Sequence, residues 1–99
     1  MQQPFLQLRS ADGEVLRDIP LSGARLVIGR SPRVDVTLDG AHVSRQHAEL
    51  TCDASGTWWI RDLGSVNGTM VNGVVLTRPQ ALALGDRIEI EGMILLYRI

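Results

Sequence analysis

Turn-forming residues interrupt this sequence every few positions, and that spacing limits its fold more than any other feature. Glycine, asparagine, aspartate and proline separate short runs in which apolar and polar side chains alternate or β-branched residues cluster. An alternation with a period of two is typical of strands that bury one face, and no long stretch shows the period of an amphipathic helix. The pattern therefore predicts an all-β sandwich or barrel.

About ten strands are expected. Asn72-Gly73 is the strongest signal for a tight two-residue hairpin. Residues 80–84 are ambiguous and could form a short helical turn. Trp58 and Trp59 adjoin on one strand, so one should face the core and the other the surface. Both ends of the chain fit strands and could pair with each other. The expected strands are 5–9, 15–19, 25–28, 36–38, 46–52, 57–63, 69–71, 74–76, 87–90 and 93–99.

The 99 residues fit one domain, spanning 1–99, which could be part of a larger protein. Ten arginines and no lysine face eleven acidic residues, and the net charge of −1 argues against a general binder of nucleic acid or membranes. No apolar run is long enough to span a bilayer, and no signal peptide is visible. The lone Cys52 fits a reducing compartment. We therefore expect a cytoplasmic protein, and the arginine bias hints at a bacterial gene.

Three loops carry polar residues that are not ordinary turn formers. Arg30 and Arg45 offer planar guanidinium forks suited to an oxyanion. Ser44 offers a hydroxyl, and Asn67 offers an amide that can both donate and accept. Two arginines and a serine meeting at one point would suit a phosphate dianion, and the asparagine would suit the backbone of an extended peptide. These loops cover residues 29–33, 42–47 and 64–69.

The order and separation of these blocks resemble the forkhead-associated (FHA) domain, over residues 5 to 99. The resemblance implies an FHA-type (SMAD/FHA-like) β-sandwich of about eleven strands, whose loops at one end bind phosphothreonine peptides. Any one block alone would be a weak signal, but the full series in an all-β chain of this length is specific. The blocks are Gly29-Arg30, Ser44-Arg45-Gln46-His47, Ser65-Val66-Asn67-Gly68-Thr69, Asn72-Gly73 and Gly85-Asp86.

The resemblance also implies a role for each matching residue. Arg30 would form a salt bridge with the phosphate, and Ser44 would hydrogen-bond a phosphate oxygen. Arg45, at a position that varies in the family, would add positive charge. Asn67 would hold the main chain of the peptide beside the phosphothreonine. Structural support of the site would come from Gly29, His47, Gly68 and Asn72.

The sequence departs from the family pattern in the third loop. Some members carry a threonine before the asparagine, and its hydroxyl reaches the phosphate, whereas this chain has Val66 there. Either the backbone amide of Val66 contributes, or the hydroxyl of Ser65 takes over. The family often selects the third residue after the phosphothreonine with a side chain just before the serine of the second loop. That position is His42 or its neighbour, which leaves the preference open.

An enzyme is the first competing hypothesis. Ser44, His47 and Asp62 could be combined into a hydrolytic triad, but no G-x-S-x-G elbow accompanies them. A metal site would need His42, His47 and Cys52 without any recognisable ligand spacing. The sequence therefore predicts no catalytic residue, no metal and no cofactor.

The remaining alternative is an FHA-fold interaction domain that uses a phospho-independent surface, such as a sheet face. The intact Arg30, Ser44 and Asn67 favour the phosphothreonine reader over this alternative. We thus expect as partner a Thr-phosphorylated protein, or a phosphorylated segment of the same parent chain, and indirectly a Ser/Thr kinase. Neither nucleic acid nor a membrane is expected as a partner, and the isolated domain is expected to be a monomer.

Overall fold

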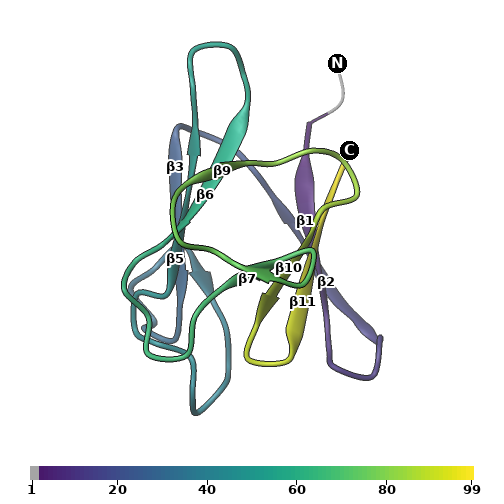
Figure 1. Ribbon diagram of the computed structural model, residues 1–99. Coiled ribbons are helices and arrows are strands. Elements are labelled where there is room, and N and C mark those ends of the chain that lie inside the picture. Colours follow the sequence, from purple (N-terminus) through teal and green to yellow (C-terminus); the bar gives the residue numbers. More distant parts are fainter. Residues whose placement is uncertain (1–2) are drawn as a thin grey trace.

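A computed structural model describes residues 3–99, and these form eleven strands and no helix. Across this part of the chain, therefore, no helix has the length and apolar character needed to cross a membrane. The strands, labelled in Figure 1 where there is room, are β1 (Phe5–Arg9), β2 (Val15–Pro20), β3 (Arg25–Gly29), β4 (Val36–Thr37), β5 (Ala48–Cys52), β6 (Trp58–Asp62), β7 (Met70–Val71), β8 (Val74–Val75), β9 (Gln80–Ala81), β10 (Arg87–Ile90) and β11 (Met93–Arg98).

The strands form two sheets that pack face to face, as the view in Figure 1 shows. One sheet has six strands in the order β2-β1-β11-β10-β7-β8, and the other has five in the order β4-β3-β5-β6-β9. The pairing of β3 with β4 is parallel, whereas the long neighbours β1–β11, β3–β5 and β5–β6 are antiparallel. The predicted all-β sandwich is confirmed.

The core lies between the sheets because strands such as β1, β6 and β10 bury alternate residues, which are apolar. In β10, Ile88 and Ile90 are fully buried, whereas Arg87 is exposed. The tryptophan pair follows the same rule, since Trp58 is 4% exposed and Trp59 is 36% exposed. Full burial of one large aliphatic side chain stabilises a fold by about 1.5–3 kcal/mol, and many such side chains meet here.

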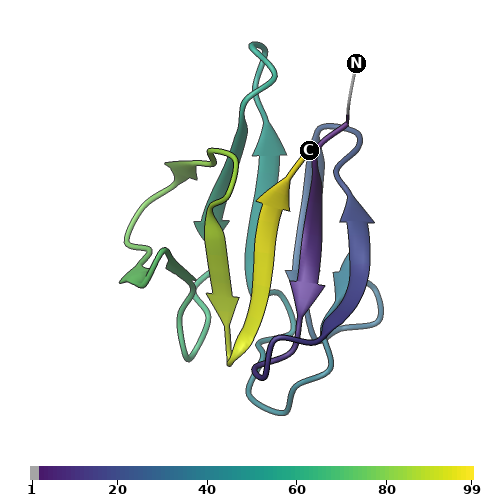
Figure 2. The same ribbon diagram turned by 90° about the vertical axis from the view of Figure 1, so that its right-hand side faces the viewer.

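The first and the last strand lie side by side, as the sequence suggested. Strand β1 pairs with β11, with Phe5 opposite Arg98. Figures 1 and 2 show the C-terminus at the same end of the sandwich as the tip of the β5–β6 hairpin. The loops that follow β3 and β6 and the one that precedes β5 emerge at the opposite end. The molecule measures 36 Å along its longest axis.

Two local predictions have different outcomes. Asn72 and Gly73 have φ angles of 51° and 81°, the left-handed pair that a type I′ hairpin requires, so that prediction is confirmed. The segment 80–84 does not form the helical turn that the sequence left open. It begins instead as strand β9, because the free edge of β6 pairs with it, Trp59 with Ala81 and Ile60 with Gln80.

Candidate functional site

The first two loops run side by side, held by their backbones. The amide of Arg30 donates to the carbonyl of Ser44 at 3.0 Å, and the amide of Ser31 donates to that of Arg45 at 3.2 Å. This approach requires a glycine at position 29, because a Cβ there would lie 2.1 Å from the carbonyl oxygen of Arg45. The supporting role expected for Gly29 thus has a steric cause.

The third loop attaches to the second by side-chain hydrogen bonds. The amide of Val66 donates to Oγ of Ser44 at 3.1 Å, and Nδ2 of Asn67 donates to the carbonyl of His42 at 3.0 Å. These bonds join positions 22 and 25 residues apart in the chain. The structure therefore brings Arg30, Ser44 and Asn67 to neighbouring loops at one end of the sandwich.

His47 supports this arrangement from beneath. Its side chain is fully buried, and Nδ1 accepts a hydrogen bond from the amide of Ser44 at 3.1 Å. Because Nδ1 accepts, the hydrogen belongs on Nε2, which lies 2.8 Å from the carbonyl oxygen of Gly68 and donates to it. One imidazole ring thus connects the second loop to the third.

Asp62, the last residue of β6, organises the third loop from within. Its carboxylate accepts hydrogen bonds from the amides of Gly64 and Ser65 and from the hydroxyls of Ser65 and Thr69, at 2.5 to 2.9 Å. Burial alone would raise the pKa of Asp62, but these hydrogen bonds outweigh it and lower the pKa. From the sequence alone, Asp62 is a candidate only for a hydrolytic triad. The signal for its structural role was an aspartate directly before a turn with glycine and serine.

Several polar groups remain available to a ligand. Arg30 is exposed and is held by one hydrogen bond, from Nε to the carbonyl of Val43 at 3.0 Å, which leaves its terminal nitrogens free to donate. The Ser44 hydroxyl accepts from Val66 and keeps its own hydrogen to donate. Asn67 uses its amide nitrogen within the fold and keeps its side-chain oxygen for an incoming N–H. Arg45 is exposed beside them.

Two of the predicted binding residues are occupied within the fold. The Ser65 hydroxyl donates to Asp62 at 2.5 Å and accepts from the amide of Gly68 at 2.9 Å. The amide of Val66 is engaged by Ser44, while its side chain is 88% exposed. Both residues therefore shape the loop that carries Asn67.

Asn72 supports the site only indirectly. Its Oδ1 accepts from the amide of Arg87 at 3.0 Å, and its Nδ2 donates to Asp86 at 2.9 Å. These bonds fix the β7–β8 hairpin to the turn before β10. The hairpin in turn reaches the third loop through the amide of Leu76, which donates to the carbonyl of Thr69 at 2.8 Å.

The geometry differs from that of a catalytic triad. Both ring nitrogens of His47 bind backbone groups, and the Asp62 carboxylate is directed to its own loop. A base that activates a serine would need to accept from that hydroxyl. Within residues 3–99, no three histidine, cysteine or acidic side chains are placed to hold a metal ion.

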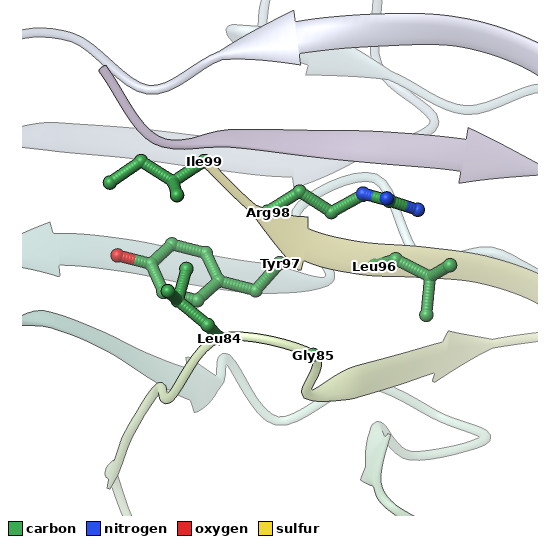
Figure 3. Close-up of a pocket in the computed structure, with 6 residues that line it drawn as sticks. All are labelled: Leu84, Gly85, Leu96, Tyr97, Arg98 and Ile99. Atoms are coloured by element: carbon green, nitrogen blue, oxygen red, sulfur yellow. The ribbon is translucent and has the colours of Figure 1, made fainter. Parts of the chain in front are cut away.

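A hollow of about 470 Å³ lies where β11 ends, away from the three loops, and Figure 3 shows the residues that line it. None of the three loops contributes to it. The polar groups that stay free to bind a ligand lie in the three loops, which are therefore the candidate functional site. The hollow is lined by Leu84, Gly85, Leu96, Tyr97, Arg98 and Ile99.

Comparison with known proteins identifies the family of this chain. The FHA domain model matches residues 26–91. The oxoglutarate dehydrogenase inhibitor of Corynebacterium efficiens is 39% identical over 83 residues, 77% of this chain and 57% of the inhibitor. Mycobacterium tuberculosis EmbR, solved in complex with a low-affinity phosphopeptide, superposes with a TM-score of 0.87 at 33% identity, over 100% of this chain and 25% of EmbR.

A structure from an analysis of phosphothreonine-dependent FHA domain interactions has a TM-score of 0.86 at 31% identity, over 99% of this chain and 97% of that one. This chain thus spans about half of the inhibitor and a quarter of EmbR, but nearly all of an isolated domain. With the matched motifs at one end of the same sandwich, the chain belongs to the FHA domain family.

Proposed function

We propose that this chain binds phosphothreonine in a protein or peptide through the three loops at one end of the sandwich. FHA domains are binding modules, and family membership makes this chain a binding module rather than an enzyme. The observation that carries the proposal is the bond from the Val66 amide to Ser44 Oγ, which joins the loop of Asn67 to the loops of Arg30 and Arg45.

The roles of the residues follow from what each one has free. The Arg30 fork pairs with two phosphate oxygens, and the Ser44 hydroxyl donates to a third. Arg45 adds a second positive charge, and Asn67 accepts from the peptide backbone. A phosphothreonine carries about −1.5 to −2 charge at pH 7, which matches two arginines. A few charge-assisted hydrogen bonds of this kind support micromolar affinity, about −8 kcal/mol.

The hydrogen bonds within the third loop support a smaller set of ligand contacts than the sequence predicted. Ser65 and Val66 act as supports, because the hydroxyl of one and the amide of the other already have partners in the loop. The exposed side chain of His42 stays a candidate for selecting a residue after the phosphothreonine, since its carbonyl is bound by Asn67.

The partner follows from this chemistry. The partner is a Thr-phosphorylated protein, or a phosphorylated segment joined to the same chain. A Ser/Thr kinase that uses ATP adds the phosphate. The related FhaA FHA domain was solved with the intracellular domain of a partner protein. We therefore propose a cytoplasmic site of action.

Fluorescence anisotropy with a degenerate phosphothreonine library, its phosphoserine counterpart and an unphosphorylated counterpart tests the function. We expect binding to phosphothreonine, with phosphoserine about ten-fold weaker because phosphoserine lacks the γ-methyl group of threonine and the apolar contacts that this group would make. Substitution of Arg30→Ala should weaken binding at least about thirty-fold, whereas Arg98→Ala, at the other end of the molecule, should not. Equal binding of the unphosphorylated library would refute the proposal and favour a sheet-face interaction.

A further inference from the structure

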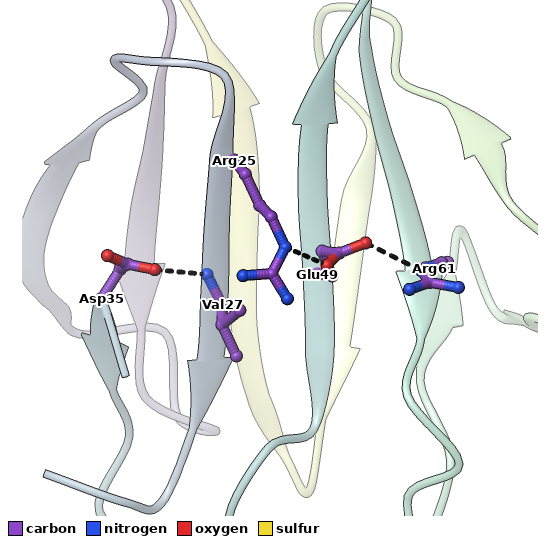
Figure 4. A network of polar contacts seen from close by, with 5 residues as sticks. All are labelled: Arg25, Val27, Asp35, Glu49 and Arg61. Carbon is purple, nitrogen blue, oxygen red and sulfur yellow. Dashed lines mark hydrogen bonds and ion pairs between the residues drawn. The ribbon is translucent and has the colours of Figure 1, made fainter. Parts of the chain in front are cut away.

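One polar network lies outside the loop site and has no use in the function proposed so far. Glu49 of β5 is on the outer face of the five-stranded sheet, and its side chain is only 6% exposed. It pairs with Nε of Arg25 and, at 2.8 Å, with Nε of Arg61, as Figure 4 shows. Burial would raise the pKa of Glu49, but the hydrogen bonds from the two arginines lower it, so the carboxylate stays ionised.

A buried ion pair is in general a poor source of stability, because the cost of desolvation cancels most of the attraction. Here, however, the arrangement has a clear effect on orientation. Arg61 remains 52% exposed and is held at Nε, so its terminal nitrogens stay free to bind something else. A guanidinium fixed in this way loses less entropy when it binds an anion.

Arg61 also lines a groove of about 310 Å³ next to the third loop. Asp62 and Gly64 continue the same wall, and the segment 76–79, with the exposed Arg78, forms the other. The carboxylate of Asp62 is already bound by its own loop. Asp62 keeps its negative charge but directs its oxygens to its own loop, so the groups that can donate to an occupant are the guanidinium groups of Arg61 and Arg78.

The groove is continuous with the proposed phosphothreonine site. Gly64, in its wall, is two residues from Val66, whose amide binds Ser44. Two residues span at most about 7 Å. An extended peptide advances about 3.3 Å per residue, so side chains a few residues from the phosphothreonine can reach the groove.

We infer that the groove between Arg61 and Arg78 binds an acidic side chain, Glu or Asp, of the phosphothreonine peptide itself. The inference rests on the proposed function, and it adds a second, weaker anion site that sets peptide preference. It lies on the strand β6 and segment 76–79, apart from the second-loop position of His42. It also gives the buried Glu49 a purpose, since that carboxylate orients Arg61 toward the mouth of the groove.

The test uses synthetic phosphothreonine peptides in an alanine background, with a single glutamate or lysine moved from four residues before the phosphothreonine to five after it. Anisotropy gives the affinity of each peptide for the 99-residue chain. At the position that reaches the groove, we expect glutamate to bind about five-fold more tightly than alanine, and lysine to bind more weakly. The ratio should fall in high salt.

Arg78→Gln is the deciding variant, because Arg78 has no role in the Glu49 network. It should reduce the glutamate-to-alanine ratio to about one and leave the affinity for the all-alanine peptide unchanged, and Arg61→Gln should act in the same way where it folds. The matched control is Arg98→Gln, which should keep the full ratio.

Two results overturn the inference: no position prefers glutamate, or the preference survives Arg78→Gln. A failure of the proposed function looks different, because then the all-alanine phosphothreonine peptide does not bind at all.

Discussion

Strand β6 connects two turns that are built with the same chemistry and have different uses. Before the strand, the Asp53 carboxylate accepts from the amides of Ser55 and Thr57, the Ser55 hydroxyl and Nε1 of Trp59. After the strand, Asp62 closes the third loop with two amides and two hydroxyls. An aspartate that closes a turn is therefore not a sign of a site.

The two turns differ in whether their residues form hydrogen bonds with other loops. The Asp53 turn is at the tip of the β5–β6 hairpin, and its side-chain hydrogen bonds stay within residues 53–59. The Asp62 loop is joined to the second loop by Val66, Asn67 and the ring of His47. Long-range connection, and not the local turn, is what makes the third loop a part of the site.

The largest expected effect is a difference in stability between alanine substitutions of two glycines, one at each end of the molecule. Gly29→Ala places a methyl group 2.1 Å from a backbone oxygen, which cannot move without separating the first two loops. We expect a loss of about 3 kcal/mol or more in the free energy of unfolding, or failure to fold. Gly56→Ala meets no atom within 4 Å and should cost about 1–2 kcal/mol through its φ of +85°.

Urea denaturation of both glycine variants measures the difference. Similar losses for the two would show that the approach of Arg45 to Gly29 is not a constraint on this fold.

The two aspartates themselves provide the second comparison. Asp62→Ala removes four hydrogen bonds from the loop of Asn67, so phosphothreonine binding should weaken at least about ten-fold even where the chain stays folded. Asp53→Ala removes as many bonds from the other turn and should leave affinity within two-fold. Titration calorimetry on both variants, with circular dichroism as a check on folding, gives the answer. Equal affinities would mean that Asn67 is positioned without Asp62.

The smallest effect is on the pH dependence of stability. Hydrogen bonds from Ser55 and Trp59 lower the pKa of Asp53 from 3.8 to about 2. A carboxylate with a lowered pKa in the fold stabilises it above the unfolded pKa, and that contribution is lost as pH falls toward the folded value. The chain should therefore lose stability between about pH 4 and pH 2, and Asp53→Ala should lose less over that window. Thermal melts across the window test this, and parallel curves would contradict it.

These comparisons also show what the sequence could and could not reveal. The strands that alternate regularly, such as 5–9 and 87–90, have the predicted bounds. The strand expected at 46–52 begins at Ala48 instead, because His47 turns its ring into the loop junction. The same ring also binds the carbonyl of Gly68, 21 residues further along the chain, and no local pattern reports that contact.

The candidate site follows the same division. Its motif residues could be named from spacing because the family resemblance supplied their order. The hydrogen-bond partners of Ser65 and Val66 could not be named, since they depend on how the third loop folds back on Asp62 and Ser44. The groove beside Arg61 was also hidden, because it forms between β6 and the segment 76–79, which meet only in three dimensions.

The pairing of β1 with β11 limits how this domain could bind a phosphothreonine in its own chain. A phosphothreonine in a segment joined to either end would have to travel the 36 Å length of the molecule to reach the loops. Fully stretched, that takes at least about ten residues. A flexible segment needs about forty residues before its root-mean-square end-to-end distance equals this span. With a shorter connecting segment, the loops would bind a phosphothreonine of another molecule instead.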